Sequence, residues 1–403
     1  MRVLIADTFE QSGRDALEAA GLEIDYQPQL ESGALAAAAR GADVLVVRST
    51  KVPADVFAEA GPLGLVIRAG AGHNTIDSQA AAAHGVFVAN VPGKNAVAVA
   101  ELTMGLILAI DRRIPENVSA AREGTWNKKE YSRADGLMGK TLGVVGLGQI
   151  GLAVAERAVG FGIKVLSVQR DRPPWIAERI KELGVVILPD LYSLLEQSDI
   201  VTLHLPASTE TKHLVDAPFL AKLRSGSILI NTSRGDLIDE TALLAVIDEK
   251  QLRVGLDVFA GEPAASTGTF DSALVSHPRV YTTHHIGAST NQAQEAIAAE
   301  VVAMIKDYGR GIARNVVNLT PPAPLGSLLV VRHYDRVGVL SAVLGALREA
   351  GLNVQEMTNQ VFSGAGASVA SIHVQGEVPS RVLTSVRGNP DVIFASVRNL
   401  PAL

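Results

Sequence analysis

Short runs of β-branched and aliphatic residues alternate with helix-length segments from the start of this 403-residue chain, and this alternation restricts its fold more than any other feature. Strands that are separated by helices cannot pair as hairpins, so they form parallel sheets with helices on both faces. We therefore predict an α/β fold. In the first part of the chain, the strand and helix pairs are predicted at 3–6 with 12–20, 44–47 with 54–60, and 66–68 with 78–84.

A second alternating series follows a long apolar helix that is predicted at 96–112. Two such series predict two doubly wound parallel-sheet domains, and a further helix at 291–307 comes after the second one. The strands of the second series are predicted at 141–145, 164–168, 200–203, 227–230 and 254–258.

The last part of the chain has a different organisation. The stretch TPPAPLG at 320–326 is predicted to be a linker, because proline neither donates to a strand ladder nor continues a helix. After it, 327–403 has predicted strands and helices in the order βαββαβ, which is the ferredoxin-like arrangement. We predict a small third domain there.

Composition narrows the class of protein. A hydrophobic fraction of 47% and a charged fraction of 19% argue against disorder, and no apolar run is long enough to span a membrane. The absence of cysteine excludes disulfides, thiolate metal sites and thiol nucleophiles, so we predict no metal site and a cytoplasmic location. A net charge of −6 without clustered Lys and Arg predicts no nucleic-acid partner.

The motif GLGQIG lies between the predicted strand 141–145 and a predicted helix. In that context Gly146 allows a tight turn, Gly148 lets the backbone approach a pyrophosphate, and Gly151 lets the helix pack on the strand. The N–H groups at Gln149 and Ile150 would face the phosphates. The motif predicts a site for the pyrophosphate of a dinucleotide.

The next strand of this domain departs from the usual pattern. An acidic residue at its end normally binds the ribose hydroxyls of NAD, but here the strand 164–168 ends in Gln169, Arg170 and Asp171, with Arg172 following. Either Asp171 takes that role from a shifted position, or the two arginines bind the 2′-phosphate of NADP. The choice between NAD and NADP stays open, with a slight preference for NADP.

Three loops that follow predicted strands carry Arg234, Glu262 and His285. Such loops meet at one edge of a parallel sheet, where ligands bind. An imidazole can take a hydroxyl proton while hydride leaves the same carbon, a carboxylate can orient that imidazole, and a guanidinium can hold a substrate carboxylate. Each residue alone has an ordinary structural explanation, but the three together predict a dehydrogenase site.

The motifs GLGQIG, NTSRG, DVFxxEP and HIGAST, in this order, make residues 1–318 resemble the D-isomer-specific 2-hydroxyacid dehydrogenase family. The segments VRSTKV, RAGAGHN and VAEL resemble its phosphoglycerate dehydrogenase branch. This resemblance implies that a dinucleotide-binding domain at 98–288 is inserted into a discontinuous substrate domain, formed by 1–97 and 289–319.

The same resemblance implies a role for each candidate residue. Arg234 would orient the substrate, Glu262 would pair with the acid–base His285, and Asp257 would face the nicotinamide carboxamide. The position before His285 is usually proline in the family and is His284 here. Further residues are implied to contact the cofactor, namely Pro206 and Thr232, and to hold the substrate, namely Arg48, Arg68, Gly70, Ala71 and Gly72.

The implied reaction is oxidation of the C2 hydroxyl of 3-phospho-D-glycerate to 3-phosphohydroxypyruvate, the first step toward L-serine. A glyoxylate or hydroxypyruvate reductase that uses NADPH is the nearest alternative. A nucleotide-sensing binding protein with little turnover is an alternative of another class. The family resemblance also implies a homodimer or homotetramer.

The tail at 327–403 is similar to an ACT domain. His333 and Asp335 are predicted in the turn after its first strand, and Asn353 is predicted just before its second strand. By resemblance, these residues imply a site for serine or another amino-acid effector. The alternative is a tail that only pairs subunits.

Overall fold

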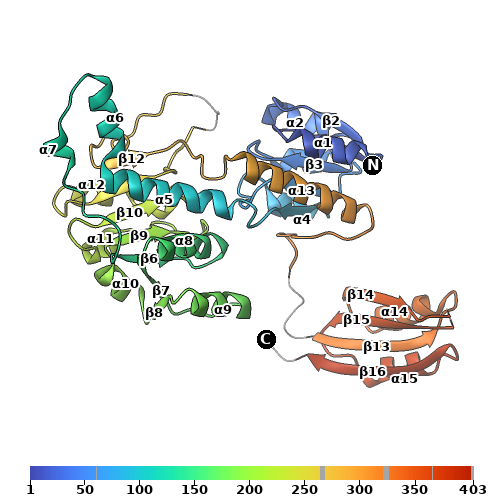
Figure 1. The fold of residues 1–403 in the computed structure, drawn as a ribbon. Coiled ribbons are helices and arrows are strands. Elements are labelled where there is room, and N and C mark those ends of the chain that lie inside the picture. The colour runs from blue at the N-terminus through green and yellow to red at the C-terminus, as the bar shows by residue number, and fades with distance from the viewer. Residues whose placement is uncertain (60, 264–267, 321–325, 365, 401–403) are drawn as a thin grey trace. The chain divides into compact units, whose positions relative to one another are not determined.

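The computed structural model describes residues 1–403 except 60, 264–267, 321–325, 365 and 401–403 (Figure 1). Its described residues form two compact units, 1–318 and 319–403. The first unit contains two parallel sheets and the second contains one antiparallel sheet. The predicted α/β fold class is therefore confirmed.

The first sheet has five parallel strands in the order β2-β1-β3-β4-β5. Every residue of β3 is buried, because helices cover both faces of the sheet. We call this sheet with its helices the first lobe. Its elements are β1 (Arg2–Ile5), α1 (Gln11–Glu18), β2 (Glu23–Tyr26), α2 (Ser32–Ala39), β3 (Val44–Val47), α3 (Ala54–Ala58), β4 (Leu65–Arg68), α4 (Ser78–Ala83) and β5 (Phe87–Asn90).

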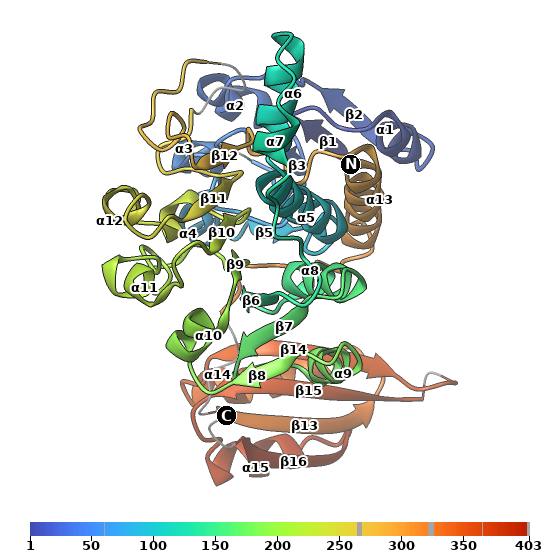
Figure 2. The same ribbon diagram turned by 60° about the vertical axis from the view of Figure 1, so that its left-hand side comes forward.

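The helix α13 (Asn291–Tyr308) returns to the first lobe after the chain has completed the second sheet. Its buried residues Ile297, Val301 and Ile305 share one hydrophobic core with strand residues such as Val3 and Ile67. Figure 2 shows α13 beside α1 and the β1 side of the sheet. The core of the first lobe is thus formed by two separate stretches of the chain.

The second sheet has seven parallel strands in the order β12-β11-β10-β9-β6-β7-β8, and we call it with its helices the second lobe. The strand order reverses between β6 and β9, which is where α/β sheets bind ligands. Its elements are α5 (Ala96–Arg112), α6 (Ile114–Arg122), α7 (Lys128–Tyr131), β6 (Thr141–Val145), α8 (Gln149–Gly160), β7 (Lys164–Val168), α9 (Pro174–Glu182), β8 (Val186–Leu188), α10 (Leu191–Gln197), β9 (Ile200–Leu203), α11 (Ala217–Lys222), β10 (Ile228–Asn231), the 3-10 helix η1 (Gly235–Leu237), α12 (Glu240–Val246), β11 (Arg253–Leu256) and β12 (Val280–Thr282).

The second unit has the predicted βαββαβ order, with an antiparallel sheet β14-β15-β13-β16 and two helices packed on one core. Residues 321–325 of the predicted linker lie outside the described residues. Among those described, no helix combines the length and apolar character needed to cross a membrane. The elements of this unit are β13 (Gly326–Tyr334), α14 (Val339–Glu349), β14 (Val354–Val361), β15 (Ala367–Gln375), α15 (Ser380–Arg387) and β16 (Val392–Leu400).

The prediction that His333 lies in a turn was wrong. Strand β13 continues to Tyr334, and His333 is a buried strand residue that is only 2% exposed. The strand buries alternate residues along its whole length, so the alternation carries the imidazole to the inner face.

Candidate active site

The glycine turn connects β6 to α8 and is shaped by two close backbone approaches. Gly146 has a φ of 101°, and a Cβ there would lie 2.4 Å from the carbonyl oxygen of His204. At Gly151 a Cβ would lie 2.2 Å from the carbonyl oxygen of Gly146. Both positions therefore exclude a side chain, and they fix the turn tightly against the sheet.

Gly148 differs from these two glycines because a Cβ there would meet no atom of the described residues within 4 Å. It is the N-cap of α8, and its neighbours Gln149 and Ile150 begin the helix, where backbone N–H groups have no acceptor within the helix. Open space beside free N–H groups at the positive end of a helix suits a pyrophosphate. The local structure thus fits a dinucleotide.

The loop after β7 carries the residues that left the cofactor type open. Gln169 and Arg170 are exposed, and the backbone N–H of Gln169 donates to Leu188. Arg172 is partly buried, and its guanidinium donates to the carbonyl oxygens of Val168 and Arg170. Asp171 is exposed.

Glu262 and His285 lie together at the edge of the second sheet. His285 Nδ1 is 2.7 Å from Glu262 Oε2, and the backbone N–H of Phe259 donates to Glu262 Oε1 at 2.8 Å. Burial alone would raise the pKa of Glu262, but the hydrogen bonds from His285 and Phe259 and the nearby Arg234 outweigh it and lower that pKa. The carboxylate is therefore ionised, and it orients the imidazole of His285 rather than that of His284.

Asp257 holds the loop that carries His285. Its Oδ1 accepts the Thr283 hydroxyl and the Ile286 N–H, and its Oδ2 accepts the Gly287 N–H. The Asp257 carbonyl also accepts the His285 N–H at 2.8 Å. Because His285 has a φ of 52°, which is unfavourable for a residue with a side chain, these bonds maintain a strained conformation at a chemically active position.

Arg234 lies beside the loop of the first lobe that contains Gly72. A Cβ at Gly72 would lie 2.2 Å from Arg234 Nη2, so the glycine makes room for the guanidinium. Arg234 Nη1 donates to the carbonyl of Ser233 at 2.6 Å. Burial lowers the pKa of Arg234, and Glu262 opposes that effect. The two lobes thus meet where the predicted substrate residues of both are found.

Two further arginines of the first lobe lie near this point. Arg68 ends β4 and donates through Nε to the carbonyl of Arg48 at 3.1 Å. Burial, together with repulsion from Arg234 and Arg48, lowers the pKa of Arg68 to about 10, while Asp7 acts in the opposite direction. The guanidinium of Arg68 is therefore close enough to Arg48 and Arg234 to be repelled by the charge of each.

Asp7 was missed by the sequence reasoning. It follows β1, and one of its oxygens accepts the backbone N–H groups of Arg48, Ser49 and Thr50. Such a carboxylate fixes the start of the loop after the neighbouring strand β3. The position of Asp7 after a buried strand was the feature of the sequence that could have indicated its role.

The remaining cofactor candidates lie on the same edge of the second lobe. The carbonyl of Pro206 accepts the Thr211 hydroxyl at 2.7 Å, which closes the loop after β9. The Thr232 hydroxyl is 2.9 Å from that of Thr103 in α5 and is buried. The Thr232 side chain is thus engaged in packing against α5.

The effector candidates of the tail do not come together within one chain. His333 Nδ1 is 2.7 Å from the Tyr334 carbonyl, and His333 Nε2 is 3.1 Å from Asn359 Oδ1. In the sheet register, His333 pairs with Ser368, whereas the exposed Asn353 precedes the opposite end of β14. The exposed Asp335 follows β13. Within one chain, His333 and Asn353 therefore lie toward opposite ends of the sheet, and the effector site stays a prediction.

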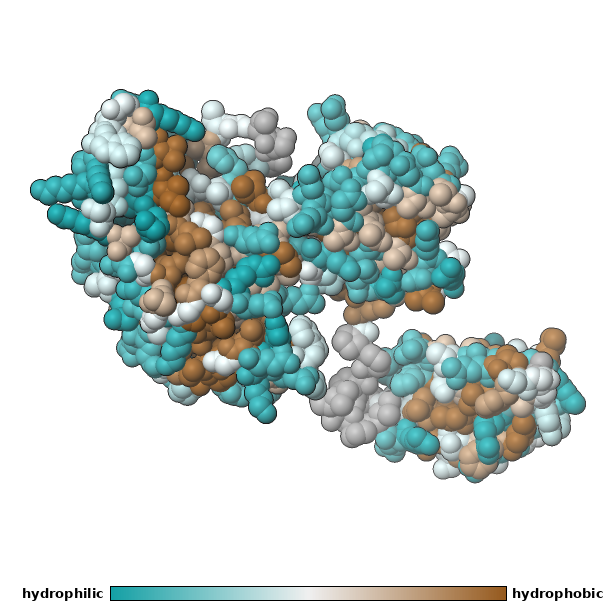
Figure 3. All heavy atoms as spheres, viewed as in Figure 1, coloured by the Kyte–Doolittle hydropathy of each residue, from teal (hydrophilic) through white to brown (hydrophobic). Residues whose placement is uncertain are grey.

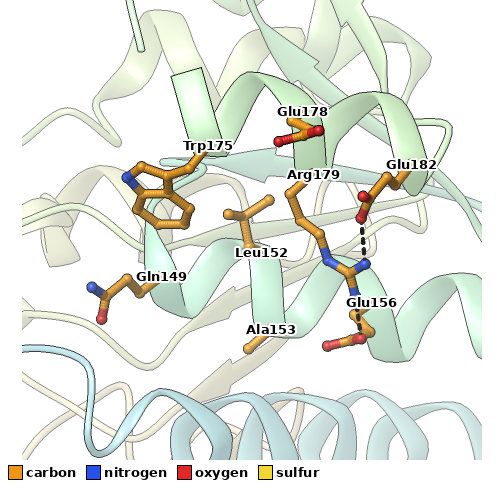
Figure 4. A pocket seen from close by; sticks show the side chains of 8 residues that line it. All are labelled: Gln149, Leu152, Ala153, Glu156, Trp175, Glu178, Arg179 and Glu182. Atoms are coloured by element: carbon orange, nitrogen blue, oxygen red, sulfur yellow. Dashed lines mark hydrogen bonds and ion pairs between the residues drawn. The ribbon is translucent and has the colours of Figure 1, made fainter. Parts of the chain in front are cut away.

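A cavity of about 390 Å³ lies between α8 and α9, and among the residues that the structure describes His285 does not line it (Figure 4). Arg179 stands between two carboxylates in it, pairing with Glu156 and, at 2.7 Å, with Glu182. Gln149 and Trp175 occupy the other end. Because its arginine is already neutralised, this cavity differs from the region of Arg48, Arg68 and Arg234.

Comparison with known proteins extends these findings. Residues 104–287 match the family model described as D-isomer specific 2-hydroxyacid dehydrogenase, NAD binding domain, and the glycine turn fits the pyrophosphate of such a nicotinamide cofactor. A solved structure of a protein from Thermus thermophilus has a TM-score of 0.69 and 33% identity, covering 79% of this chain and 100% of that one.

Two curated relatives match over long stretches. The D-3-phosphoglycerate dehydrogenase of Methanocaldococcus jannaschii is 38% identical over 334 residues, which are 81% of this chain and 62% of that relative. The hydroxypyruvate reductase of Thermotoga maritima is 42% identical over 270 residues, which are 66% of this chain and 85% of that relative. Together with the fold and the site geometry, these matches show that the chain belongs to the D-isomer-specific 2-hydroxyacid dehydrogenase family.

Proposed function

We propose that this protein is a D-3-phosphoglycerate dehydrogenase. It oxidises the C2 hydroxyl of 3-phospho-D-glycerate to 3-phosphohydroxypyruvate and thereby begins the synthesis of L-serine. The chain spans 62% of the length of its archaeal relative of that name, and the residues of the site support the proposal. We also keep the predictions of a cytoplasmic location and of domain boundaries near residues 97 and 289 as part of this proposal.

The observation that carries the proposal is the group of three guanidiniums at Arg48, Arg68 and Arg234. Burial, and after it repulsion from Arg234 and Arg48, lowers the pKa of Arg68, so the charged form of Arg68 is disfavoured here and a bound anion would stabilise it. A carboxylate with a phosphate monoester carries a charge of about −2.5 to −3 at neutral pH. Hydroxypyruvate, with a single carboxylate, would leave much of this positive charge uncompensated.

The loop at 70–72 is suited to the substrate carboxylate. Asn90 donates to the Ala71 carbonyl at 2.6 Å, which leaves the loop backbone fixed. Among the residues that the structure describes, the N–H groups of Ala71 and Gly72 have no acceptor. These donors and Arg234 beside them bind a carboxylate and polarise the neighbouring C2 oxygen.

The proton of the C2 hydroxyl goes to His285. With Nδ1–H donated to Glu262, the Nε2 atom is left as the acceptor, and the ionised Glu262 stabilises the imidazolium that forms. The bound nicotinamide ring supplies the acceptor for the hydride that leaves C2. Reduction runs the same steps in reverse, with His285 returning the proton.

The test compares two keto acids, 3-phosphohydroxypyruvate and hydroxypyruvate, in steady-state reduction. We expect the wild type to prefer the phosphorylated acid, and Arg48→Ala to raise its KM at least about 10-fold while changing the KM of hydroxypyruvate little. Arg48→Lys, which retains the charge, serves as the matched control. Equal effects on both acids would instead favour the hydroxypyruvate reductase activity named for the Thermotoga relative.

The acid–base assignment has its own test. His285→Ala is expected to lower kcat by about 10²- to 10⁴-fold, and Glu262→Gln by a smaller factor, with cofactor binding retained in both variants. Cofactor binding is followed by the fluorescence of the reduced nicotinamide. A His285→Ala variant with near wild-type turnover would remove His285 from the mechanism and would favour a different base.

We further infer that the protein works as a homodimer or homotetramer. An apolar band runs over the second lobe from α6 across α5 and α8 (Figure 3). Side chains exposed in this region include Ile114, Val118 and Phe161, which are 46%, 41% and 46% exposed. Light scattering of the full chain tests the inference, and a monomer at micromolar concentration would contradict it.

For the tail, the strand register supports a more restricted proposal. A serine or other amino-acid site that uses both His333 and Asn353 has to be built between two copies of the chain, because one chain separates them. Calorimetric titration of the full chain with L-serine tests this, with Asn353→Ala expected to abolish the heat of binding. If the wild-type chain gives no heat of binding with L-serine, the result favours the alternative in which the tail only pairs subunits.

A further inference from the structure

The carboxyl end of β7 is the part of the dinucleotide site that the proposed function leaves unexplained. Strand β7 pairs with β6, so the loop after β7 lies next to the glycine turn that receives the pyrophosphate. This is where the ribose of the adenosine half is bound in folds of this kind. At the strand end stands Gln169, which has no charge with which to repel an anion.

The two arginines of this loop are an unusual pair. Arg172 is held at the strand end by the Val168 carbonyl, and burial together with the charge of Arg170 lowers its pKa. In the described part of the chain neither arginine forms an ion pair with a carboxylate, although Arg157 and Arg179 nearby both do. Two neighbouring cations without a counterion are an arrangement that an anion would stabilise.

We propose that Arg170 and Arg172 bind the 2′-phosphate of the adenosine ribose, and that the protein prefers NADP(H) to NAD(H). A phosphate dianion accepts bidentate hydrogen bonds from guanidinium groups and would neutralise the pair. Gln169 permits this, whereas an aspartate or glutamate there would repel the phosphate. The inference depends on the dinucleotide site and not on which keto acid is the substrate.

Binding of nucleotide fragments tests the proposal without catalysis. The full chain is titrated by calorimetry with adenosine 2′,5′-bisphosphate and with adenosine 5′-monophosphate. We expect the bisphosphate to bind at least about 10-fold more tightly than the monophosphate. Arg170→Ala should remove most of that difference, while the affinity for the monophosphate stays unchanged. Equal affinities for the two nucleotides in the wild type, or an equal loss for both in Arg170→Ala, would overturn the proposal.

Arg179→Ala is the matched control, because it removes an arginine of the same lobe that already pairs with Glu156 and Glu182 (Figure 4). It should leave the preference for the bisphosphate intact. In the opposite direction, Gln169→Asp should reverse the preference, because the new carboxylate accepts the ribose hydroxyls and repels the phosphate.

Asp171 offers the competing explanation, since it could accept the ribose hydroxyls of NAD from its own position. If so, Asp171→Ala would lower the affinity for adenosine 5′-monophosphate more than the affinity for adenosine 2′,5′-bisphosphate. That result would also contradict the proposal. Because these titrations contain no keto acid, their failure is distinguishable from failure of the phosphoglycerate assignment.

Discussion

The carboxylate of Asp7 accepts the backbone N–H of Arg48 at 2.6 Å, although the two residues belong to different βα units of the first lobe. The same oxygen accepts the N–H groups of Ser49 and Thr50 at 3.1 and 3.0 Å. A charged acceptor shared by three successive donors fixes the beginning of the loop from which the Arg48 side chain extends. Asp7 is therefore a positioning residue for the proposed phosphate contact.

Replacing Asp7 tests that relationship. In Asp7→Ala, we expect the KM for 3-phosphohydroxypyruvate to rise about 10-fold or more, because losing charge-assisted bonds of about 1.5–3 kcal/mol frees the Arg48 loop. The kcat should change little, and the KM for hydroxypyruvate should be nearly constant. A uniform fall in kcat for both acids, measured by steady-state kinetics, would indicate a general structural defect instead.

Substitutions in the glycine turn should separate a loss of dinucleotide affinity from a loss of stability. Gly148→Ala places a methyl group in open space with φ at −87°, so stability should be unchanged while dinucleotide affinity falls. Gly151→Ala places its methyl group 2.2 Å from a carbonyl oxygen, so it should lower stability by about 1–3 kcal/mol. Denaturant unfolding and cofactor titration of both variants check this; a destabilised Gly148→Ala protein would argue against an open site.

Asp257 predicts a defect in both stability and turnover. Asp257→Asn replaces one acceptor oxygen by a donor that faces a backbone N–H, at a residue that is 1% exposed. We expect a loss of about 2–4 kcal/mol in the free energy of unfolding and a lower kcat, because the loop of His285 is released. Thr283→Val, which removes a single hydroxyl from the same carboxylate, should cost about 1 kcal/mol. Undiminished turnover in Asp257→Asn would show that the loop does not need this anchor.

His204 predicts a pH dependence of stability. Burial lowers the pKa of its imidazole to about 3 from an ordinary value of 6.5, and its buried Nδ1 has no hydrogen-bond partner among the described residues. Between these pH values the unfolded chain binds one proton more than the folded chain, so the contribution to stability is complete above pH 6.5 and is lost as the pH falls. The expected slope approaches about 1.4 kcal/mol per pH unit below pH 6.

Urea unfolding between pH 7 and pH 4 measures this slope. The variant His204→Gln can still bond to the Thr202 hydroxyl, which now lies 3.0 Å from His204 Nε2, but it has no group that titrates. Its stability should fall less steeply with decreasing pH than that of wild type. Parallel curves for the two proteins would show that His204 is not the responsible group.

Local patterns predicted the parts of the fold and site that depend on neighbours in sequence. The glycine turn is a strand, a turn and a helix in succession, and Arg234, Glu262 and His285 each follow a strand, so their meeting at one sheet edge could be expected. Strands with weak local signals were missed, such as β2 and β8. The sequence of β2, EIDY, is that of a half-exposed edge strand with no apolar run.

Long-range relationships could not be predicted in this way. Asp7 and Arg48 are 41 residues apart, and they meet only because the sheet order places β1 beside β3. His333 is different, because the period of two that buries Leu329 and Val331 in β13 continues to it. The alternation of buried and exposed residues in β13 could have placed His333 in the strand, but the strand was predicted to end before it.

The return of α13 to the first lobe has a consequence for synthesis on the ribosome. The five strands of that lobe are complete by Asn90, but their core includes Ile297, Val301 and Ile305, which emerge some 200 residues later. The nascent chain must therefore carry an uncovered apolar sheet surface while the second lobe, whose sheet lies between the two segments, is translated and folds. The connectivity thus prevents the first lobe from completing its core until α13 has been synthesised.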